Sequence, residues 1–332
     1  MENIYCIYHA DCLDGWVAAL GVKQYAQKNN IDFKMEPYYY GDPINYDQVA
    51  EDTTVYIVDF SFDANVIWML SGKCRKVYVF DHHHGWKDEA AELQDFIESE
   101  MAVNNNIEVV FDETRSGALI TWEHLGLYVP DWVRAVSDRD LWQFKLRLSS
   151  EICHALLSHG LEWNLFWGMM LVADNTVTDT LAIEGVAIVR ARNQMSEHLV
   201  ENSRSEIRLF GSETVDIVEC PRVLISETLE MVNKLNSNYV TQLGHIDTTY
   251  AIGYHTAYTN RWKYSLRAGH DNVDLSIIAK RFGGGGHRRA ASFYLKNEGY
   301  DAVTTLARAN AKWMRDQHPS VLQKLKQWFT KD

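Results

Sequence analysis

The first half of the chain alternates short apolar runs with longer segments of helical periodicity. The apolar runs are rich in β-branched and aromatic residues, as buried parallel strands are, and they cover residues 4–8, 55–58, 76–80 and 107–111. The intervening segments repeat apolar residues every three or four positions and predict helices over residues 15–28, 63–71, 88–100, 116–125 and 130–144. This alternation predicts an α/β fold with a doubly wound parallel sheet.

The pattern changes after a long helical segment without proline at residues 180–206. Strands are expected over residues 207–210, 215–219, 250–254 and 262–267. Helices are expected over residues 226–235, 274–282 and 302–331, with Ser226 and Asp274 as N-caps of the first two. We therefore predict a second, smaller mixed α/β domain joined by a helical connector. The predicted boundaries are 1–175 for the first domain, 176–208 for the connector and 209–332 for the second domain.

The amino-acid composition argues against several classes of protein. The five cysteines are odd in number and form no CxxC pair, which favours a reducing compartment and argues against a disulfide frame or a zinc site built from thiolates. No basic, apolar leader opens the chain and no run approaches the roughly 18 apolar residues that span a bilayer, so a cytoplasmic protein without membrane contact is expected. The net charge of −13 disfavours a stable complex with long nucleic acid and favours short substrates held in one pocket.

Carboxylate and imidazole side chains follow three of the predicted strands directly. His9, Asp11 and Asp14 come after the first strand, Asp59 after the second, and the triplet 81–83 (Asp-His-His) after the third. Because the carboxyl ends of parallel strands meet at one edge of the sheet, these side chains are expected to converge. Such donors without thiolate suit Mn²⁺ or Mg²⁺. The structural alternatives are an Asx turn after the first strand and a helix cap at Asp59.

A run of four glycines, Gly283 to Gly286, precedes His287, Arg288 and Arg289. Glycine lets backbone N–H groups approach an anion closely, and the three following side chains can all hydrogen-bond a phosphate. The alternative is a mobile surface hairpin.

Together these motifs resemble the DHH phosphoesterase superfamily. The segment 80–85 (Phe-Asp-His-His-His-Gly) carries the first part of the resemblance. The glycine-rich segment 282–293 resembles the signature of the DHH-associated C-terminal domain, and the segment 264–267 (Tyr-Ser-Leu-Arg) resembles its arginine strand. The resemblance extends from about residue 4 to about residue 295. Small-oligonucleotide phosphodiesterases, or nano-RNases, look most similar in motif style, and exonucleases of the RecJ type and pyrophosphatases share the metal motifs.

The resemblance implies two divalent metal ions, Mn²⁺ with Mg²⁺ or Co²⁺ as alternatives. It assigns them the ligands His9, Asp11, Asp14, Asp59, His82 and Asp138, with Asp59 shared between the two ions. The first motif departs from the common His-x-x-x-Asp-x-Asp spacing, because Leu13 stands where the middle aspartate usually lies. Asp140 is the alternative to Asp138, and a charged helix end is the structural alternative to both.

The resemblance also implies roles outside the ligand set. It assigns Asp81 and His83 to orienting the site and contacting phosphate, as catalytic residues, and gives His84 no role. It assigns substrate binding to Arg267, Gly284, Gly285, Gly286, His287 and Arg288. We therefore expect a metal-dependent phosphodiesterase that hydrolyses short oligonucleotides or linear dinucleotides with a water activated by two metals. The alternatives are a single-strand exonuclease of RecJ type, a small-molecule phosphatase or pyrophosphatase, and a degenerate DHH module without activity.

Overall fold

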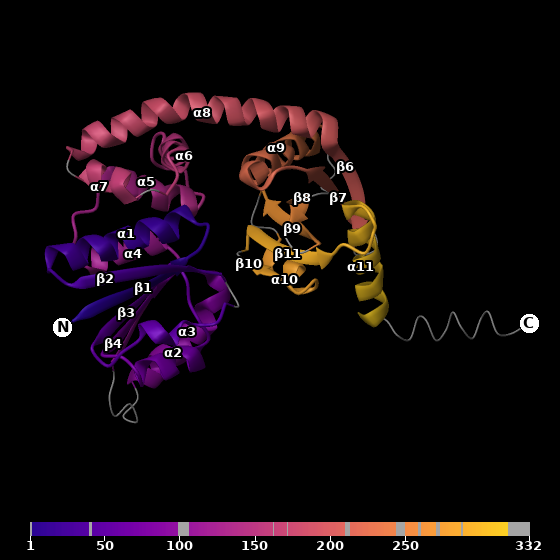
Figure 1. Ribbon diagram of the computed structural model, residues 1–332. Coiled ribbons are helices and arrows are strands. Elements are labelled where there is room, and N and C mark those ends of the chain that lie inside the picture. The colour runs from indigo at the N-terminus through magenta and orange to yellow at the C-terminus, as the bar shows by residue number, and fades with distance from the viewer. Residues whose placement is uncertain are drawn as a thin grey trace, which may run out of the picture. The chain divides into compact units, whose positions relative to one another are not determined.

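The computed structural model divides into two compact units, Met1–Arg190 and Ala191–Asp332 (Figure 1). It describes residues 2–39, 42–98, 106–161, 163–170, 172–209, 213–243, 250–257, 260–269, 273–286 and 288–317. A continuous helix of 30 residues, α8 (Asp174–Ser203), begins in the first unit and ends in the second. Each unit has its own sheet and its own hydrophobic core.

The first unit contains a sheet of five parallel strands in the order β2-β1-β3-β4-β5. Their bounds are β1 (Asn3–His9), β2 (Asp32–Tyr38), β3 (Thr53–Val58), β4 (Lys76–Asp81) and β5 (Ile107–Phe111). The order reverses between β1 and β3, and the carboxyl edge at such a reversal is where open α/β sheets bind ligands. The predicted doubly wound parallel sheet is therefore confirmed. Strand β2 escaped prediction because it is an edge strand with mostly polar or half-buried residues rather than an apolar run.

Helices cover both faces of this sheet (Figure 1). One core lies between the sheet and α1 (Leu13–Lys28), α4 (Gly117–His124), α5 (Asp131–Asp140), α6 (Ser149–Ser158) and α7 (Trp163–Met170). The other lies beneath α2 (Ala64–Ser71) and α3 (Lys87–Glu98). The strands β3 and β4 contribute alternate residues to the two cores, as the period of a strand requires. Helices α6 and α7 were not predicted.

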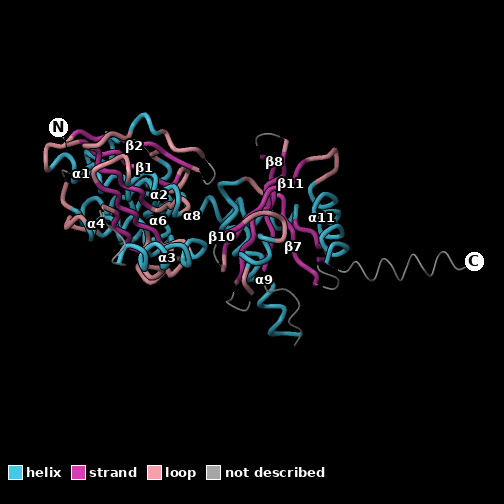
Figure 2. Tube along the Cα trace, turned by 90° about the horizontal axis from the view of Figure 1, so that it is seen from below, coloured by secondary structure: helices cyan, strands magenta, loops and turns pink. Residues whose placement is uncertain are grey.

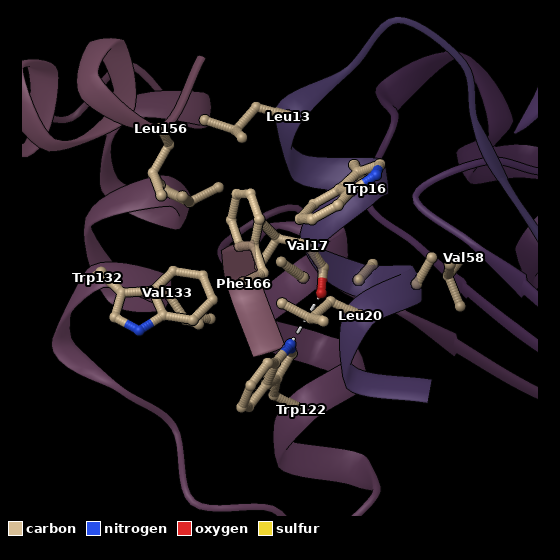
Figure 3. Packing of buried hydrophobic residues seen from close by; sticks show 14 of the residues in the cluster. Leu13, Trp16, Val17, Leu20, Val58, Trp122, Trp132, Val133, Leu156 and Phe166 are labelled. Carbon is tan, nitrogen blue, oxygen red and sulfur yellow. Dashed lines mark hydrogen bonds between the residues drawn. The ribbon is translucent and has the colours of Figure 1, made fainter. Parts of the chain in front are cut away.

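Large aromatic side chains fill the core on the α1 side, as Figure 3 shows. Trp16, Trp122, Trp132 and Phe166 are buried there, and the indole N–H of Trp122 donates to the carbonyl of Val17 at 2.9 Å. This bond joins α4 to α1. Because buried aromatic groups pack closely and a buried indole N–H needs a partner, the two helices are held in a defined relation.

The predicted helix over residues 130–144 is shorter than expected. Helix α5 ends at Asp140, and two residues of the following segment, Trp142 and Phe144, adopt left-handed backbone angles that no α-helix accommodates. The prediction of Ser226 as an N-cap is also wrong, because the helix around it begins one residue earlier, at Ile225. The prediction for Asp274 is confirmed: its carboxylate accepts the backbone N–H of Ser276 at 3.0 Å.

The second unit contains a mixed sheet of six strands in the order β10-β11-β9-β8-β7-β6. Their bounds are β6 (Arg204–Leu209), β7 (Glu213–Glu219), β8 (Tyr250–Ala257), β9 (Arg261–Ala268), β10 (Gly285–Gly286) and β11 (Ala290–Lys296). Only β7 and β8 pair in parallel within this sheet. The predicted mixed α/β character of this unit is confirmed.

Helices lie on both sides of the second sheet (Figures 1 and 2). Helix α9 (Ile225–Leu243) shares a core with the end of α8, while α10 (Leu275–Lys280) and α11 (Ala302–Gln317) belong to the core of the other face. The helix predicted over residues 302–331 is confirmed as far as Gln317, and its remainder lies outside the described residues. Within the described segments, no helix combines the length and the apolar character that crossing a membrane would require.

Candidate metal centre

Five carboxylate and imidazole side chains meet at the carboxyl edge of the first sheet. His9 ends β1, Asp59 and His82 follow β3 and β4 directly, Asp14 lies in the first turn of α1, and Asp140 ends α5. His82 is central: its Nε2 atom lies 3.0 Å from Oδ1 of Asp59, 3.4 Å from Oδ2 of Asp140 and 4.0 Å from Oδ2 of Asp14. The Nδ1 atom of His9 lies 3.6 Å from Oδ2 of Asp59. The structure thus brings four of the six predicted ligands together, with Asp140 as a fifth residue.

Asp59 has an unusual backbone. Its φ of 54° lies in the left-handed region, which costs a non-glycine residue about 1–2 kcal/mol. Two glycines pack against it from the N-terminal turns of α1 and α4. A Cβ on Gly15 would lie 3.0 Å from Oδ2 of Asp59, and a Cβ on Gly117 would lie 2.5 Å from its Cβ atom. Strain of this kind persists where the surroundings impose it, often at functional sites.

Asp14 is held in place by the start of α4. The hydroxyl of Ser116 donates to Oδ1 of Asp14 at 2.6 Å, and the backbone N–H of Ala118 donates to Oδ2 at 3.2 Å. Ser116 is positioned in turn by its own N–H, which donates to Oγ of Ser137 at 3.2 Å. Residues of α4 with its N-cap, and of α5, therefore fix a carboxylate of α1 that lies more than a hundred positions earlier in the sequence.

In this group several carboxylates surround the single imidazole of His82, so negative charge predominates. Burial and the charges of Asp59 and Asp140 raise the pKa of Asp14 well above its ordinary value. Desolvation and the charge of Asp59 also raise the pKa of Asp140, although His82 opposes them. Burial alone would lower the pKa of His82, but the hydrogen bond to Asp59 and the charge of Asp140 raise it to about 10. Carboxylates crowded around a single imidazole repel one another, and a bound cation would relieve that repulsion.

The donor set fits divalent metal ions. Oδ2 of Asp59 is buried and makes no hydrogen bond within the described residues, so a carboxylate oxygen is left to face a cation. Donor atoms of three overlapping groups lie within 4.8 Å of one another: Asp14 with His82 and Asp140, Asp59 with His82 and His83, and His9 with Cys12 and Asp59. Asp59 occurs in two of these groups, as a carboxylate that bridges two ions would. The side chains of His9 and Asp140, which are 24% and 28% exposed, leave the group open to solvent.

Asp138 does not join this group. Its two carboxylate oxygens accept the backbone N–H groups of Lys145 at 2.9 Å and Leu146 at 3.1 Å, and Asp138 thereby holds the segment after α5. The structure therefore places Asp140, the alternative, rather than the favoured Asp138 near the other candidate ligands. Residues two apart on a helix point in directions that differ by roughly 200°. The local sequence does not reveal which of the two faces the sheet edge.

Asp11, a predicted ligand, lies outside the group of candidate donors, whereas Cys12, which was not predicted, lies within it. Asp11 lies in a turn with φ of 55°, accepts the hydroxyl of Tyr39 at 2.8 Å, and belongs to none of the three donor groups. The thiol of Cys12 lies with His9 and Asp59 instead. Sequence reasoning missed Cys12 because it expected a site without thiolate. Its place between His9 and Asp14 was the signal available in the sequence.

Asp81 orients the two imidazoles that follow it. Its Oδ1 atom accepts the backbone N–H of His82 at 2.7 Å, the backbone N–H of His83 at 3.1 Å and Nδ1 of His83 at 2.7 Å. Burial lowers the pKa of His83, but the charge of Asp81 outweighs it and raises the pKa above the ordinary value. His84 lies apart, paired with Glu113 at the surface at 2.6 Å.

The predicted substrate-binding residues of the second unit lie on neighbouring strands. Arg267 on β9 pairs with Ala290 on β11, and its guanidinium donates to the carbonyl of Leu266 at 2.9 Å and to Oγ of Ser226 at 3.3 Å. The glycine-rich segment forms the short strand β10 beside β11. A Cβ on Gly284 would lie 2.1 Å from the carbonyl oxygen of Ser292, so this backbone approach requires glycine.

Of the remaining predicted binding residues, the structure describes Gly285, Gly286 and Arg288. Gly286 has a φ of 140°, which favours glycine, and Gly285 is part of the same two-residue strand. Arg288 is exposed, and its carbonyl accepts the N–H of Leu275 at 2.9 Å. His287 lies outside the described residues.

No protein-family model matches the chain. A curated relative is the uncharacterized protein R106 of Acanthamoeba polyphaga mimivirus, which is 22% identical over 306 residues. The match covers 86% of this chain and 66% of the viral protein, so the chain spans just under two thirds of that relative's length.

Among solved structures, the DHH domain of a member of the S1p family of ribosomal proteins is similar, with a TM-score of 0.58 and 16% identity. The superposition covers 94% of this chain and 86% of that one. RecJ from Thermus thermophilus in complex with Mn²⁺ gives a TM-score of 0.48 at 14% identity, covering 95% of this chain and 52% of RecJ. The pGpG-specific phosphodiesterase PggH from Vibrio cholerae gives 0.41 at 12% identity, covering 93% and 99%. The likeness to the first of these structures shows that the protein has the fold of the DHH superfamily.

Proposed function

We propose that the protein is a phosphodiesterase that depends on divalent metal ions. The observation that carries the proposal is the convergence of His9, Asp14, Asp59, His82 and Asp140 at the switch point of a parallel sheet. They surround a buried carboxylate oxygen that makes no hydrogen bond to the part of the chain that the structure describes. When bound there, two divalent ions would supply positive charge to a phosphate and lower the pKa of a water that attacks phosphorus.

Asp59 is the proposed shared ligand. Its two oxygens face different partners, Oδ1 toward His82 and Oδ2 toward His9, which suits a carboxylate between two ions. Asp14, His82 and Asp140 are the proposed ligands on one side of it, and His9 on the other. Ser116 and Ala118 keep Asp14 in the required orientation, since partners that hold a ligating carboxylate preserve its geometry.

His83 is the proposed contact to a phosphate oxygen. Its Nδ1 atom is hydrogen-bonded to Asp81, which fixes the orientation of the ring, and Nε2 is the proposed contact to the substrate. The raised pKa of His83 favours a protonated ring that can donate a hydrogen bond to an anion.

Short oligonucleotides or linear dinucleotides are the proposed substrates. The net charge of −13 opposes the binding of a long polyanion, whereas a short one needs only a local group of donors. Arg267 and the glycine-rich segment lie on neighbouring strands of the second unit and provide such donors. The groups proposed to bind a substrate phosphate are Arg267, Arg288 and the backbone of Gly284 to Gly286.

The test is a panel of 5′-labelled RNA and DNA, from dinucleotides to twenty-mers, together with pyrophosphate, each incubated with Mn²⁺. We expect the shortest oligonucleotides to be cleaved fastest, and chelation to abolish cleavage. His82→Ala should lose activity by several orders of magnitude, whereas the matched control His84→Ala, on the adjacent surface residue, should retain it. Full activity after exhaustive chelation, or cleavage of pyrophosphate alone, would overturn the proposal.

A further inference from the structure

Cys12 lies inside the candidate metal centre rather than beside it. Its sulfur, a ring nitrogen of His9 and a carboxylate oxygen of Asp59 all lie within 4.8 Å of one another. Cys12 is partly exposed, whereas the other four cysteines are buried: Cys6, Cys74, Cys153 and Cys220. A thiol beside metal-binding side chains, on a residue that is partly exposed, differs in surroundings from a thiol used for packing.

The thiol is not used to cap the helix that it precedes. Cys12 occupies the N-cap position of α1 with extended backbone angles, φ −117° and ψ 131°, yet its side chain makes no capping hydrogen bond. Ser, Thr, Asp and Asn are the residues that stabilise this position. Ser116 and Asp274 do cap their helices in this chain. Cys12 therefore stands where one of these residues would stabilise the helix better.

A second observation points to a ligand at the same place. Oδ2 of Asp59, a residue only 1% exposed, makes no hydrogen bond within the described residues. A buried carboxylate oxygen without a hydrogen bond is costly unless a group outside the polypeptide satisfies it. The sulfur of Cys12 belongs to the same donor group as this carboxylate.

We propose that Cys12 is a sulfur ligand of the divalent ion held by His9 and Asp59. The inference rests on the proposed metal centre and adds a donor to it. Binding breaks the S–H bond, forms the sulfur–metal bond and releases the proton to solvent. The two metal positions then differ in chemistry. The position of Asp14, His82 and Asp140 offers only oxygen and nitrogen, which suits Mn²⁺ or Mg²⁺, while the position of Cys12 favours thiophilic ions such as Co²⁺ or Zn²⁺.

The test is a titration of the metal-free protein with Co²⁺, followed by absorption in the near ultraviolet, where a Co²⁺–thiolate bond gives a charge-transfer band. Bound Co²⁺ is measured independently by elemental analysis. We compare the wild type with Cys12→Ser and with Cys74→Ser. Cys74 is a matched control because it precedes β4, at the end of the strand opposite Asp81, and its thiol donates only to the carbonyl of Lys76 at 3.6 Å.

We expect the band in the wild type and in Cys74→Ser, and its loss in Cys12→Ser, which should still bind Co²⁺ at the other position. Serine is a good N-cap, so Cys12→Ser is expected to fold, and Cys12→Ala provides a second variant without any donor atom. A wild type that binds Co²⁺ without the band, or a band that survives in both Cys12 variants, overturns the role of Cys12 and leaves the metal centre standing. A wild type that binds no Co²⁺, Mn²⁺ or Mg²⁺ overturns both proposals.

Discussion

Asp59 and Gly117 are in contact so close that a methyl group on Gly117 would lie 2.5 Å from Cβ and 2.7 Å from Cα of Asp59. The two residues are 58 positions apart in the sequence and meet where β3 ends and α4 begins. The glycine therefore lets the start of a helix reach the carboxylate that the candidate metal centre shares.

The first prediction concerns this contact. Gly117→Ala should displace Asp59, lower the free energy of unfolding by about 1–3 kcal/mol and abolish metal binding, because Cα and Cβ of Asp59, the nearest atoms that it would meet, cannot move away by a change of rotamer. Helix propensity alone predicts the opposite sign, a gain of about 1 kcal/mol for Ala in place of Gly within a helix. Urea unfolding and metal content measure the effect. Gly85→Ala, where a Cβ would meet nothing within 4 Å, serves as the control and should stay within about 0.5 kcal/mol.

The second prediction separates Asp140 from Asp138. Asp140→Asn should weaken metal binding with little loss of stability, because it removes one of the mutually repelling carboxylates near His82. Asp138→Asn should retain metal but lower the free energy of unfolding by about 1–2 kcal/mol, since the segment after α5 loses an acceptor for a backbone N–H. The metal content and the urea unfolding of both variants are measured. If Asp138→Asn loses metal and Asp140→Asn retains it, Asp138 rather than Asp140 is the ligand.

The third prediction is that divalent ions stabilise the fold. A ligand that binds only the native state at about a hundred times its dissociation constant adds about 2.7 kcal/mol. Mn²⁺ should therefore raise the melting temperature of the wild type, and a chelator should return it to the metal-free value. Asp59→Asn should show a much smaller rise, because one donor serves both positions. An equal rise in this variant would remove Asp59 from the ligand set.

The fourth prediction concerns thiol reactivity. In the metal-free native chain, Cys12 should react with an aromatic disulfide reagent before the other four cysteines, which are buried, because it is partly exposed. The reaction should be slow at neutral pH and faster at alkaline pH, because burial and the charges of Asp59, Asp140 and Asp14 raise the pKa of Cys12 well above its ordinary value. Prior loading with Co²⁺ should slow that reaction, and all five thiols should react in denaturant. Peptide mapping identifies the modified residue. Rapid modification of a thiol in native Cys12→Ser would contradict the assigned burial of the remaining four.

The fifth prediction separates binding from chemistry in the second unit. Arg267→Ala should lower kcat/KM for a dinucleotide about ten- to a hundred-fold through the loss of a charge-assisted hydrogen bond to phosphate. Hydrolysis of bis-p-nitrophenyl phosphate should fall less, and the metal content should stay unchanged. Arg261→Ala is the matched control on the same strand, where the residue is exposed. If both substrates fall equally, or if metal is lost, Arg267 does not serve substrate binding.

Much of the fold was predictable because its determinants are local. The buried strands of the first sheet appear in the sequence as apolar runs, and a strand that carries His9, Asp59 or His82 at its carboxyl end delivers that side chain to the sheet edge whatever the details of packing. The parallel arrangement, the mixed second sheet and the convergence of these three residues thus follow from patterns a few residues long. Strand β2 did not, because an edge strand lacks the apolar signal.

The sequence by itself determined which strands end in metal-binding side chains, and only the tertiary structure decided which other side chains join them. Asp140 rather than Asp138 faces His82 because of the way α5 packs against the neighbouring helices α1, α4 and α6, with Trp132 in the shared core. Cys12 rather than Asp11 faces Asp59 because a left-handed residue turns the chain between β1 and α1. Hydrophobic periodicity reports which face of an element is buried, whereas the direction of one side chain at its end depends on contacts made by residues far away in the sequence.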